Sequence, residues 1–188
     1  IHTWTKPGHY LIHLSASLEP SAADLVTSRS VEVLALPTLF VNASNPAPAF
    51  PFDSWETAAT TIQDAVDASE AGQTIRVADG IYQTGGRTVE GIANRVAIEH
   101  PVRVESVNGP SVTIIRGGQD SGFTRGVQLA DGAVLSGFTV TGGTIWLNGP
   151  EGEGGGIHCA PGAVVTNCWI LDNTCESRRG GGVWGGTL

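Results

Sequence analysis

Charged and aromatic side chains are scarce in this 188-residue chain, and methionine is absent. No run of about eighteen apolar residues occurs, so we expect no membrane-spanning helix. The formal net charge of −8 disfavours a protein that binds the phosphate backbone of nucleic acids. Hydrophobic residues nevertheless make up 40% of the chain, which excludes wholesale disorder and is enough for a buried core.

The 26 glycines show no three-residue period, which excludes a collagen-like chain. So much glycine with so little charge is typical of short strands joined by tight turns. The chain has no initiator methionine and stops within a strand pattern at Leu188. We therefore expect a processed chain or a piece of a longer protein, and the sequence shows no signal peptide.

The N-terminal part alternates apolar and polar side chains, as strands do. Two strands are predicted, at 10–15 and 30–34, with a turn at 6–9 before the first. Residues 2–14 and 28–33 resemble the closing half of a PKD-type, immunoglobulin-like module. That resemblance implies a partial β-sandwich, which needs support from elsewhere because two or three strands rarely form a stable sandwich.

Prolines between residues 37 and 53 indicate a linker, which contains one short strand at 39–41. A helix at about 55–71 is predicted to follow, with Ser54 as its N-cap and Gly72 as its end. The apolar residues of this segment recur at helical spacing and form one stripe. No other segment has a convincing helical pattern.

The sequence becomes periodic after Gly72. Five triplets of apolar, variable and apolar residues begin 25 to 30 residues apart. Residues 130–140 also align with 160–170 without a gap, at an offset of 30. A period of roughly 20–50 residues built from short strands predicts a solenoid, in which each unit buries its apolar face against the next. The triplets are 75–77, 102–104, 127–129, 157–159 and 183–185.

Residues 72–82 and 137–143 resemble a right-handed parallel β-helix of the pectin-lyase-like superfamily. The glycine-rich segments 154–159 and 180–185 are similar to coils of large bacterial surface proteins. The resemblance implies an all-β solenoid of about five coils, with a helix capping its N-terminal end and an open C-terminal coil. The expected parts are a sandwich segment at 1–36, a linker with the first strand at 37–53, and the β-helix at 54–188.

The middle residue of each triplet is predicted to point outward, because its two neighbours point into the core. Stacked coils would align these residues in one row on one face of the solenoid. Arginine binds carboxylate or sulfate groups and indole stacks on sugar rings, so the row is a candidate glycan-binding site. The alternative is that exposed positions simply carry polar residues. The row consists of Arg76, Arg103, Gln128, His158 and Trp184.

Three cysteines lie in the C-terminal part, at Cys159, Cys168 and Cys175. The offset of 30 places each of them over an apolar position of the preceding unit, so we expect them to pack as small hydrophobic residues. One disulfide is the alternative. A metal site is disfavoured, since the spacings match no zinc pattern.

Polysaccharide-cleaving enzymes of this superfamily cluster aspartates with lysine or arginine, often around calcium. Here Asp120, Asp131 and Asp172 are scattered, and the last two occupy predicted turns. No pair suits a general acid and base, so we favour a non-catalytic chain. We expect no metal site and no cofactor; calcium stays open as an alternative, although no motif indicates it.

Three functions compete. The first is an extracellular or cell-surface protein that binds glycans or mediates adhesion, because both parts resemble modules of exported bacterial proteins. The second is a fragment of a polysaccharide lyase or glycoside hydrolase, with its catalytic coils beyond Leu188. The third is a self-assembling filament subunit, in which the incomplete N-terminal module and the open C-terminal coil pair with other copies. We rank them in this order, with a polysaccharide surface as the main expected partner.

Overall fold

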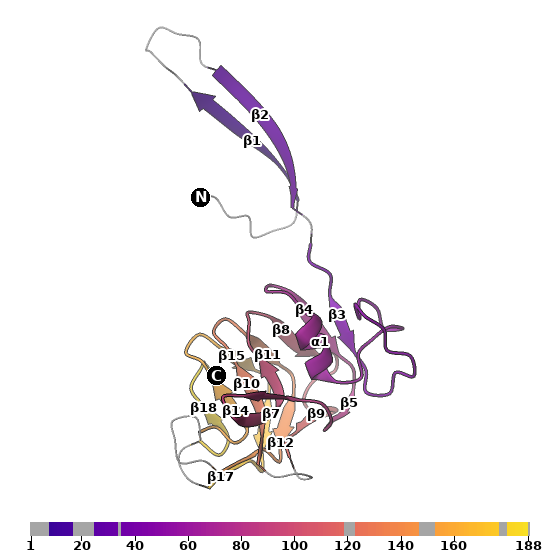
Figure 1. Cartoon of the computed structure of the whole chain (residues 1–188), viewed down its shortest axis with the longest axis vertical. Coiled ribbons are helices and arrows are strands. Elements are labelled where there is room, and N and C mark those ends of the chain that lie inside the picture. Colours follow the sequence, from indigo (N-terminus) through magenta and orange to yellow (C-terminus); the bar gives the residue numbers. More distant parts are fainter. Residues whose placement is uncertain are drawn as a thin grey trace. The chain divides into compact units, whose positions relative to one another are not determined.

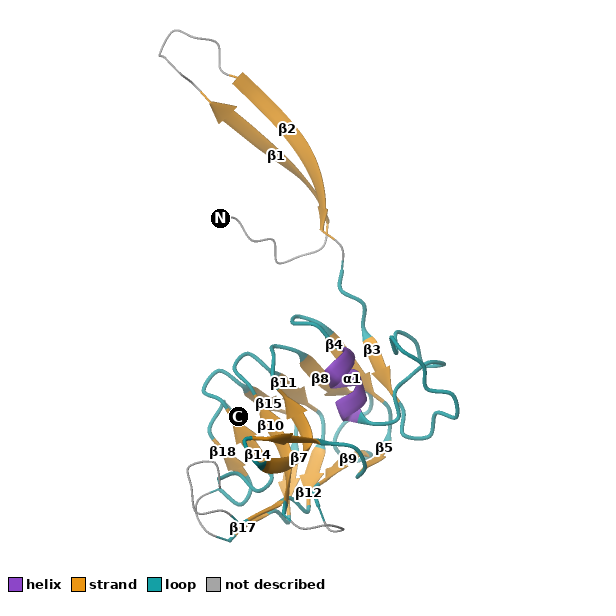
Figure 2. Cartoon of the chain, viewed as in Figure 1, coloured by secondary structure: helices purple, strands orange, loops and turns teal. Residues whose placement is uncertain are grey.

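The computed structural model describes residues 8–16, 25–33, 35–118, 123–146, 153–176 and 180–187. The chain divides into two compact units, Ile1–Leu36 and Pro37–Leu188. Figures 1 and 2 show a pair of strands in the first unit, and many short strands with one short helix in the second. Among the described residues, no helix is long and apolar enough to cross a membrane.

The first unit contains an antiparallel pair of strands, β1 (Gly8–Ala16) and β2 (Leu25–Val33). The pairing runs from Gly8 opposite Val33 to Ala16 opposite Leu25. The prediction of a turn at 6–9 is therefore wrong for Gly8 and His9, because backbone pairing with β2 draws both into the strand; Lys6 and Pro7 lie outside the described residues. A two-stranded sheet is all that the described residues show of the expected sandwich.

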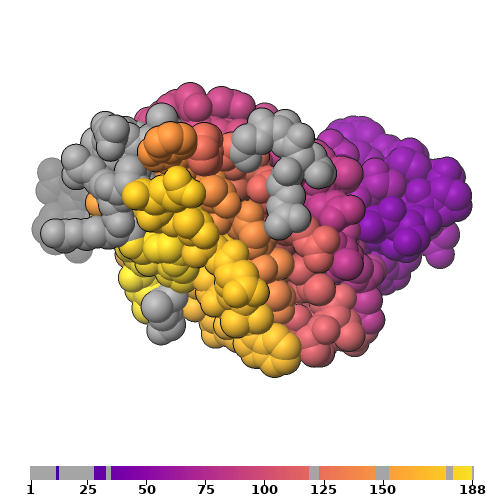
Figure 3. Space-filling model, turned by 90° about the horizontal axis from the view of Figure 1, so that it is seen from below, coloured from indigo at the N-terminus to yellow at the C-terminus, as the bar shows by residue number. Residues whose placement is uncertain are grey.

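The second unit is a parallel β-solenoid, as the repeat predicted. Strands of successive turns lie in register in three sheets, and Figure 3 shows their colours following one another along the solenoid. The first sheet contains β3 (Leu39–Val41), β4 (Thr74–Val77), β8 (Arg103–Ser106), β11 (Val134–Ser136) and β15 (Val164–Thr166). The second contains β5 (Gly80–Tyr82), β9 (Thr113–Arg116), β12 (Thr139–Thr141) and β16 (Trp169–Leu171).

The third sheet contains β6 (Arg87–Val89), β7 (Ile92–Ile98), β10 (Thr124–Leu129), β14 (Ile157–Cys159) and β18 (Val183–Trp184). Its first two strands form an antiparallel hairpin, and the other neighbours pair in parallel. A two-stranded corner sheet joins β13 (Thr144–Ile145) to β17 (Thr174–Cys175).

The solenoid has fewer turns than the sequence suggested. From β4 through β8 and β11 to β15 the chain makes three full turns, whereas about five coils were expected. Each triplet was counted as one coil, but the triplets at 102–104 and 127–129 belong to β8 and β10, which are two strands of the same turn. The structure places the triplets at 75–77 and 102–104 along the first sheet and the other three in the third sheet.

The core lies between the three sheets and consists of stacked rows of apolar side chains. Alternation along each strand sends every second residue inward, and the parallel register places that residue over its counterpart in the next turn. Most of these residues are less than 5% exposed. One inward row per sheet runs Ile75–Val104–Leu135–Val165, Tyr82–Ile115–Val140–Ile170 and Val96–Val127–Ile157–Val183.

The single helix, α1 (Ile62–Ala68), is shorter than the predicted 55–71. Thr61 is its N-cap and accepts a hydrogen bond from the backbone N–H of Asp64. Ser54 was expected in that role but closes a separate turn with Thr57, after which the chain is extended and Ala59 bridges to β3. Backbone pairing with the first strand therefore competes with helix formation before residue 62.

The helix packs against β3, β4 and β7 at the N-terminal end of the solenoid. Its buried Gln63 side chain accepts a hydrogen bond from the backbone N–H of Ala97 at 2.7 Å and donates one to the Ala97 carbonyl at 3.2 Å. The pairing of β6 with β7 ends at Asn94, so these two bonds occupy backbone groups of β7 that β6 does not pair with. The helix thus covers a strand edge that would otherwise be open to pairing with another chain.

Candidate functional site

Three of the five residues predicted to form the outward row do lie side by side. Gln128, His158 and Trp184 occupy equivalent positions on β10, β14 and β18 of the third sheet, next to Ala97 of β7. The parallel register therefore brings together side chains that are 26 to 30 residues apart in the sequence.

The other two residues are elsewhere, so the prediction of one continuous row is wrong. Arg76 and Arg103 belong to the first sheet, in two adjacent outward rows. Arg76 lies opposite Glu105, with 3.7 Å between its Nε and a carboxylate oxygen, whereas Arg103 lies opposite Thr74 and Val134. Strands β4 and β8 pair at an offset of 29 residues, not 27, which shifts Arg103 out of line with Arg76.

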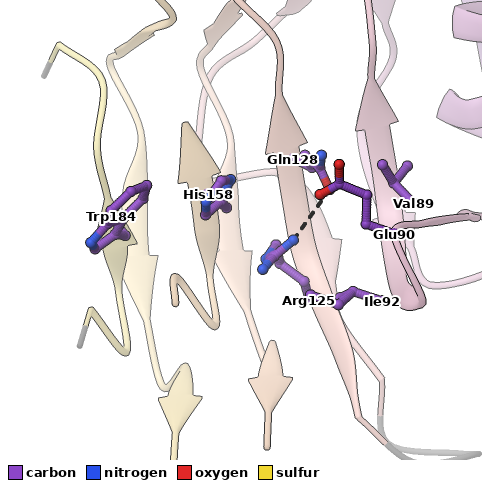
Figure 4. A pocket seen from close by; sticks show the side chains of 7 residues that line it. All are labelled: Val89, Glu90, Ile92, Arg125, Gln128, His158 and Trp184. Atoms are coloured by element: carbon purple, nitrogen blue, oxygen red, sulfur yellow. Dashed lines mark hydrogen bonds between the residues drawn. The ribbon is translucent and has the colours of Figure 1, made fainter. Parts of the chain in front are cut away.

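The remaining row borders a cleft of about 210 Å³ on the third sheet. Figure 4 shows the aromatic residues of β14 and β18 at one end and the β6–β7 hairpin at the other. The cleft is smaller than the roughly 300–1,000 Å³ sites that hold drug-sized ligands, so its size suits one ring of a larger molecule. Its lining consists of Val89, Glu90, Ile92, Arg125, Gln128, His158 and Trp184.

The imidazole of His158 and the indole of Trp184 form a stack at one end of the cleft. Their ring centroids lie 4.8 Å apart and their planes differ by 12°. That distance equals the spacing of neighbouring strands, about 4.8 Å, because both residues project from equivalent positions of paired strands. The sheet therefore fixes the stack, and the indole remains 37% exposed.

Arg125 lies beneath the polar part of the cleft and is only 2% exposed. Its guanidinium donates to the backbone carbonyls of Gly154 and Glu153, both at 3.0 Å. It also donates to the side-chain oxygens of Asn94 at 3.1 Å and Gln128 at 3.2 Å. Arg125 thus connects the strand that carries it with the turns on either side.

This network orients the outward amide of Gln128. Because the Gln128 oxygen accepts from Arg125, its amide nitrogen points away from that guanidinium and can donate to a ligand. Burial lowers the pKa of Arg125 to about 10, so the side chain remains a cation at neutral pH. The buried guanidinium therefore holds the Gln128 amide in one orientation at the base of the cleft.

The sequence reasoning missed Arg125, although one signal pointed to it. Arg125 precedes Val127 by two residues, and alternation alone would place it inward, among the core residues. The structure instead turns it toward the cleft and Gln128, because it is the intervening Gly126 whose Cβ would meet Val140 of the core. Asn94 holds the equivalent position of the preceding turn and is also buried. Two polar residues at equivalent positions of neighbouring strands, where alternation predicts core residues, indicate a buried polar network.

Glu90 was also missed. It occupies the tight turn between β6 and β7, where Val89 faces Ile92, and its φ of 51° is in the left-handed region. Such two-residue turns favour asparagine or glycine at this position. The turn holds a carboxylate at the hairpin end of the cleft, opposite the aromatic stack (Figure 4).

The aspartates considered in the sequence do not gather at this cleft. Asp131 accepts a hydrogen bond from the backbone N–H of Gly162 in the next turn at 2.9 Å, and Asp172 has a φ of 51° typical of a turn. Asp120 lies outside the described residues. Within the described part of the chain, no group of three histidine, cysteine, aspartate or glutamate residues could hold a metal ion.

The three cysteines occupy the apolar positions that the repeat predicted. Cys159 pairs with Leu129 and Cys175 with Ile145, and the Cys168 sulfur accepts from the backbone N–H of Phe138 at 3.4 Å. All three are free thiols, and Cys159 and Cys168 pack with the hydrophobic core. Burial raises the pKa of Cys159 to about 11, which keeps its thiol protonated at neutral pH.

Comparison of the chain with protein-family models, with curated proteins and with solved structures found no match. The parallel solenoid therefore stands on the strand topology alone. The narrower resemblances, to the pectin-lyase-like superfamily and to PKD modules, stay predictions, and function has to be argued from the cleft.

Proposed function

We propose that the chain is a non-catalytic glycan-binding module of an extracellular or cell-surface protein, and that the third-sheet cleft binds one sugar unit. The observation that carries this proposal is the combination of a fixed aromatic stack with an oriented amide in the same small cleft. Sugars need both kinds of contact, since they carry apolar C–H faces and hydroxyl groups that donate and accept hydrogen bonds.

Each part of the cleft has a role in such a complex. The indole of Trp184 and the side chains of Val89 and Ile92 offer apolar surface. Gln128 can donate to a sugar hydroxyl and Glu90 can accept from one. The sheet holds the stack and Arg125 holds the amide, so both are ordered before a sugar binds. Binding therefore costs little side-chain conformational entropy.

The charges favour a neutral sugar over an acidic one. The cleft contains one carboxylate, Glu90, and one guanidinium, Arg125, whose positive and negative charges offset each other. Arg76 and Arg103, which would have suited a carboxylate or sulfate group, lie on another sheet. Their role in binding acidic glycans stays a prediction without support from this cleft.

The test is a titration of the chain with neutral and acidic polysaccharides, with co-sedimentation and chain cleavage followed in the same tubes. Trp184→Ala and Gln128→Ala should each weaken binding of a neutral polysaccharide by roughly tenfold, because each removes one of the two kinds of contact. Trp169→Ala is the matched control, since Trp169 is 52% exposed on the second sheet, away from the cleft.

Four outcomes would contradict the proposal. Binding that survives both cleft variants would place the glycan elsewhere, and the absence of binding to any polysaccharide would remove the function. Cleavage would make the chain an enzyme, with Glu90 and His158 as the first groups to test for proton transfer. Sedimentation without polysaccharide would instead point to self-association.

A further inference from the structure

A second cleft lies on a different part of the solenoid. It has a volume of about 280 Å³ and is lined by Trp55, Ala78, Asp79, Val107 and Asn108. The last four follow β4 and β8, at the corner where the first sheet passes into the second. The two clefts share no lining residue.

Two polar side chains at this corner form a pair across neighbouring turns. The amide nitrogen of Asn108 donates to one carboxylate oxygen of Asp79 at 2.9 Å, and both residues are exposed. A backbone hydrogen bond from Val107 to Val77, at 2.9 Å, fixes the two turns next to each other. The pair presents carboxylate and amide oxygens as acceptors, together with the remaining N–H of the amide as a donor.

The aromatic wall of the cleft is held in place by the loop before α1. Trp55 is 39% exposed and packs against Phe40, with ring centroids 4.6 Å apart. The loop is fixed by Asn45, whose side chain donates to the carbonyls of Glu56 and Ala58 at 3.2 and 2.6 Å. The indole therefore has a defined position before any ligand arrives.

We propose that this corner is a second saccharide site, for one neutral sugar unit with two adjacent hydroxyl groups. The Asp79–Asn108 pair would hold the two hydroxyls, and Trp55 would cover an apolar C–H face of the same ring. The single carboxylate of the cleft disfavours acidic sugars. This site goes beyond the proposed function, because it does not depend on the third-sheet cleft.

Two sites on one chain have a measurable consequence. A polysaccharide that reaches both clefts would bind more tightly than either cleft binds a free sugar, since the second contact forms at a raised effective concentration. Free sugars cannot bridge the clefts, so they report each site separately.

The experiment titrates methyl glycosides of glucose, galactose and mannose, with the methyl glycoside of glucuronic acid as the acidic probe, and measures binding by ligand-observed NMR and calorimetry. It uses the whole chain and the variants Asp79→Ala, Trp55→Ala and Trp184→Ala. Asp79→Ala should weaken binding of at least one neutral glycoside by roughly tenfold at the corner site. Trp184→Ala should leave that affinity unchanged.

Asn108→Ala is a second variant of the proposed site, because Asn108 is exposed and bonded to Asp79, and its melting temperature separates lost binding from lost folding. A melting temperature equal to that of the wild type, together with weaker binding, would support the corner site. Wild-type affinity in both Asp79→Ala and Asn108→Ala would overturn it. If only Trp184→Ala loses binding, the corner site is overturned and the third-sheet cleft is supported as the binding site. If only the Asp79→Ala and Asn108→Ala variants lose binding, the corner site is supported and the third-sheet cleft is overturned.

Discussion

Two neighbouring segments, an inner one at 127–145 and an outer one at 157–175, have the same strand pattern but differ in burial. Every paired residue between them is offset by 30, in all four places where their strands meet. Phe138, Val140 and Ile145 of the inner segment are fully buried. Their counterparts in the outer segment, Cys168, Ile170 and Cys175, are only half-buried.

The difference in burial depends on which later residues of the same chain pack against the segment, rather than on the segment's own sequence. Ile157 and Cys159 of the outer segment remain buried where β18 and the following glycines lie against them. Burial falls at β16 and β17, which are the last described strands of their sheets. Stability in a solenoid is therefore a property of the contact between turns, and equivalent positions in two turns should respond differently to substitution.

The largest difference is expected for Phe138→Ala against Cys168→Ala, two equivalent inward positions. Removing a fully buried phenylalanine should lower the free energy of unfolding by about 3–5 kcal/mol. The half-buried cysteine should lose about 1 kcal/mol or less, because fewer of its contacts are with the core. Urea unfolding followed by circular dichroism measures both, and equal losses would mean that burial does not decide the effect.

A smaller difference is expected between the paired glycines Gly156 and Gly182. A Cβ on Gly156 would lie 2.5 Å from the Gly182 carbonyl oxygen and 2.8 Å from the Asn173 side chain, whereas one on Gly182 would meet only Ile170, at 3.5 Å. Gly156→Ala should therefore destabilise by about 1–3 kcal/mol through overpacking. Gly182→Ala should be neutral or slightly stabilising, since alanine restricts the unfolded chain. Thermal unfolding of the two variants distinguishes them, and similar melting temperatures would contradict the close packing.

The smallest effect concerns the thiols. Unfolded protein without reductant should give three free thiols, and in the native protein at pH 8 the thiol of Cys159 should react slowest, because its pKa is raised to about 11. The unfolded chain loses that proton near pH 9, so the free energy of unfolding should fall as the pH rises from about 9 to 11. Cys159→Ala should weaken this pH dependence. Two thiols or fewer in the unfolded protein would mean that a disulfide forms.

Much of the fold followed from local pattern. The gapless alignment at an offset of 30 predicted both the parallel register of the last two turns and the positions of all three cysteines. The helix was expected in the right region, yet its start was misjudged by several residues. Ala59 pairs with the first strand, a contact that no helical periodicity could indicate.

The candidate site was only partly predictable. Gln128, His158 and Trp184 were placed together correctly, because strand alternation alone decides that they point outward. Arg125 and Glu90 were missed, since one depends on a buried network and the other on the turn of a hairpin.

The sequence by itself determined that strands repeat, that they stack in parallel and which side of each strand faces the core. These are consequences of period and alternation, which act between residues a fixed number of positions apart. Only the tertiary structure decided which sheet each strand joins, because the turns between sheets differ in length from one coil to the next. Arg76 and Arg103 were separated from His158 for this reason, and the predicted row of five residues became a row of three beside a cleft.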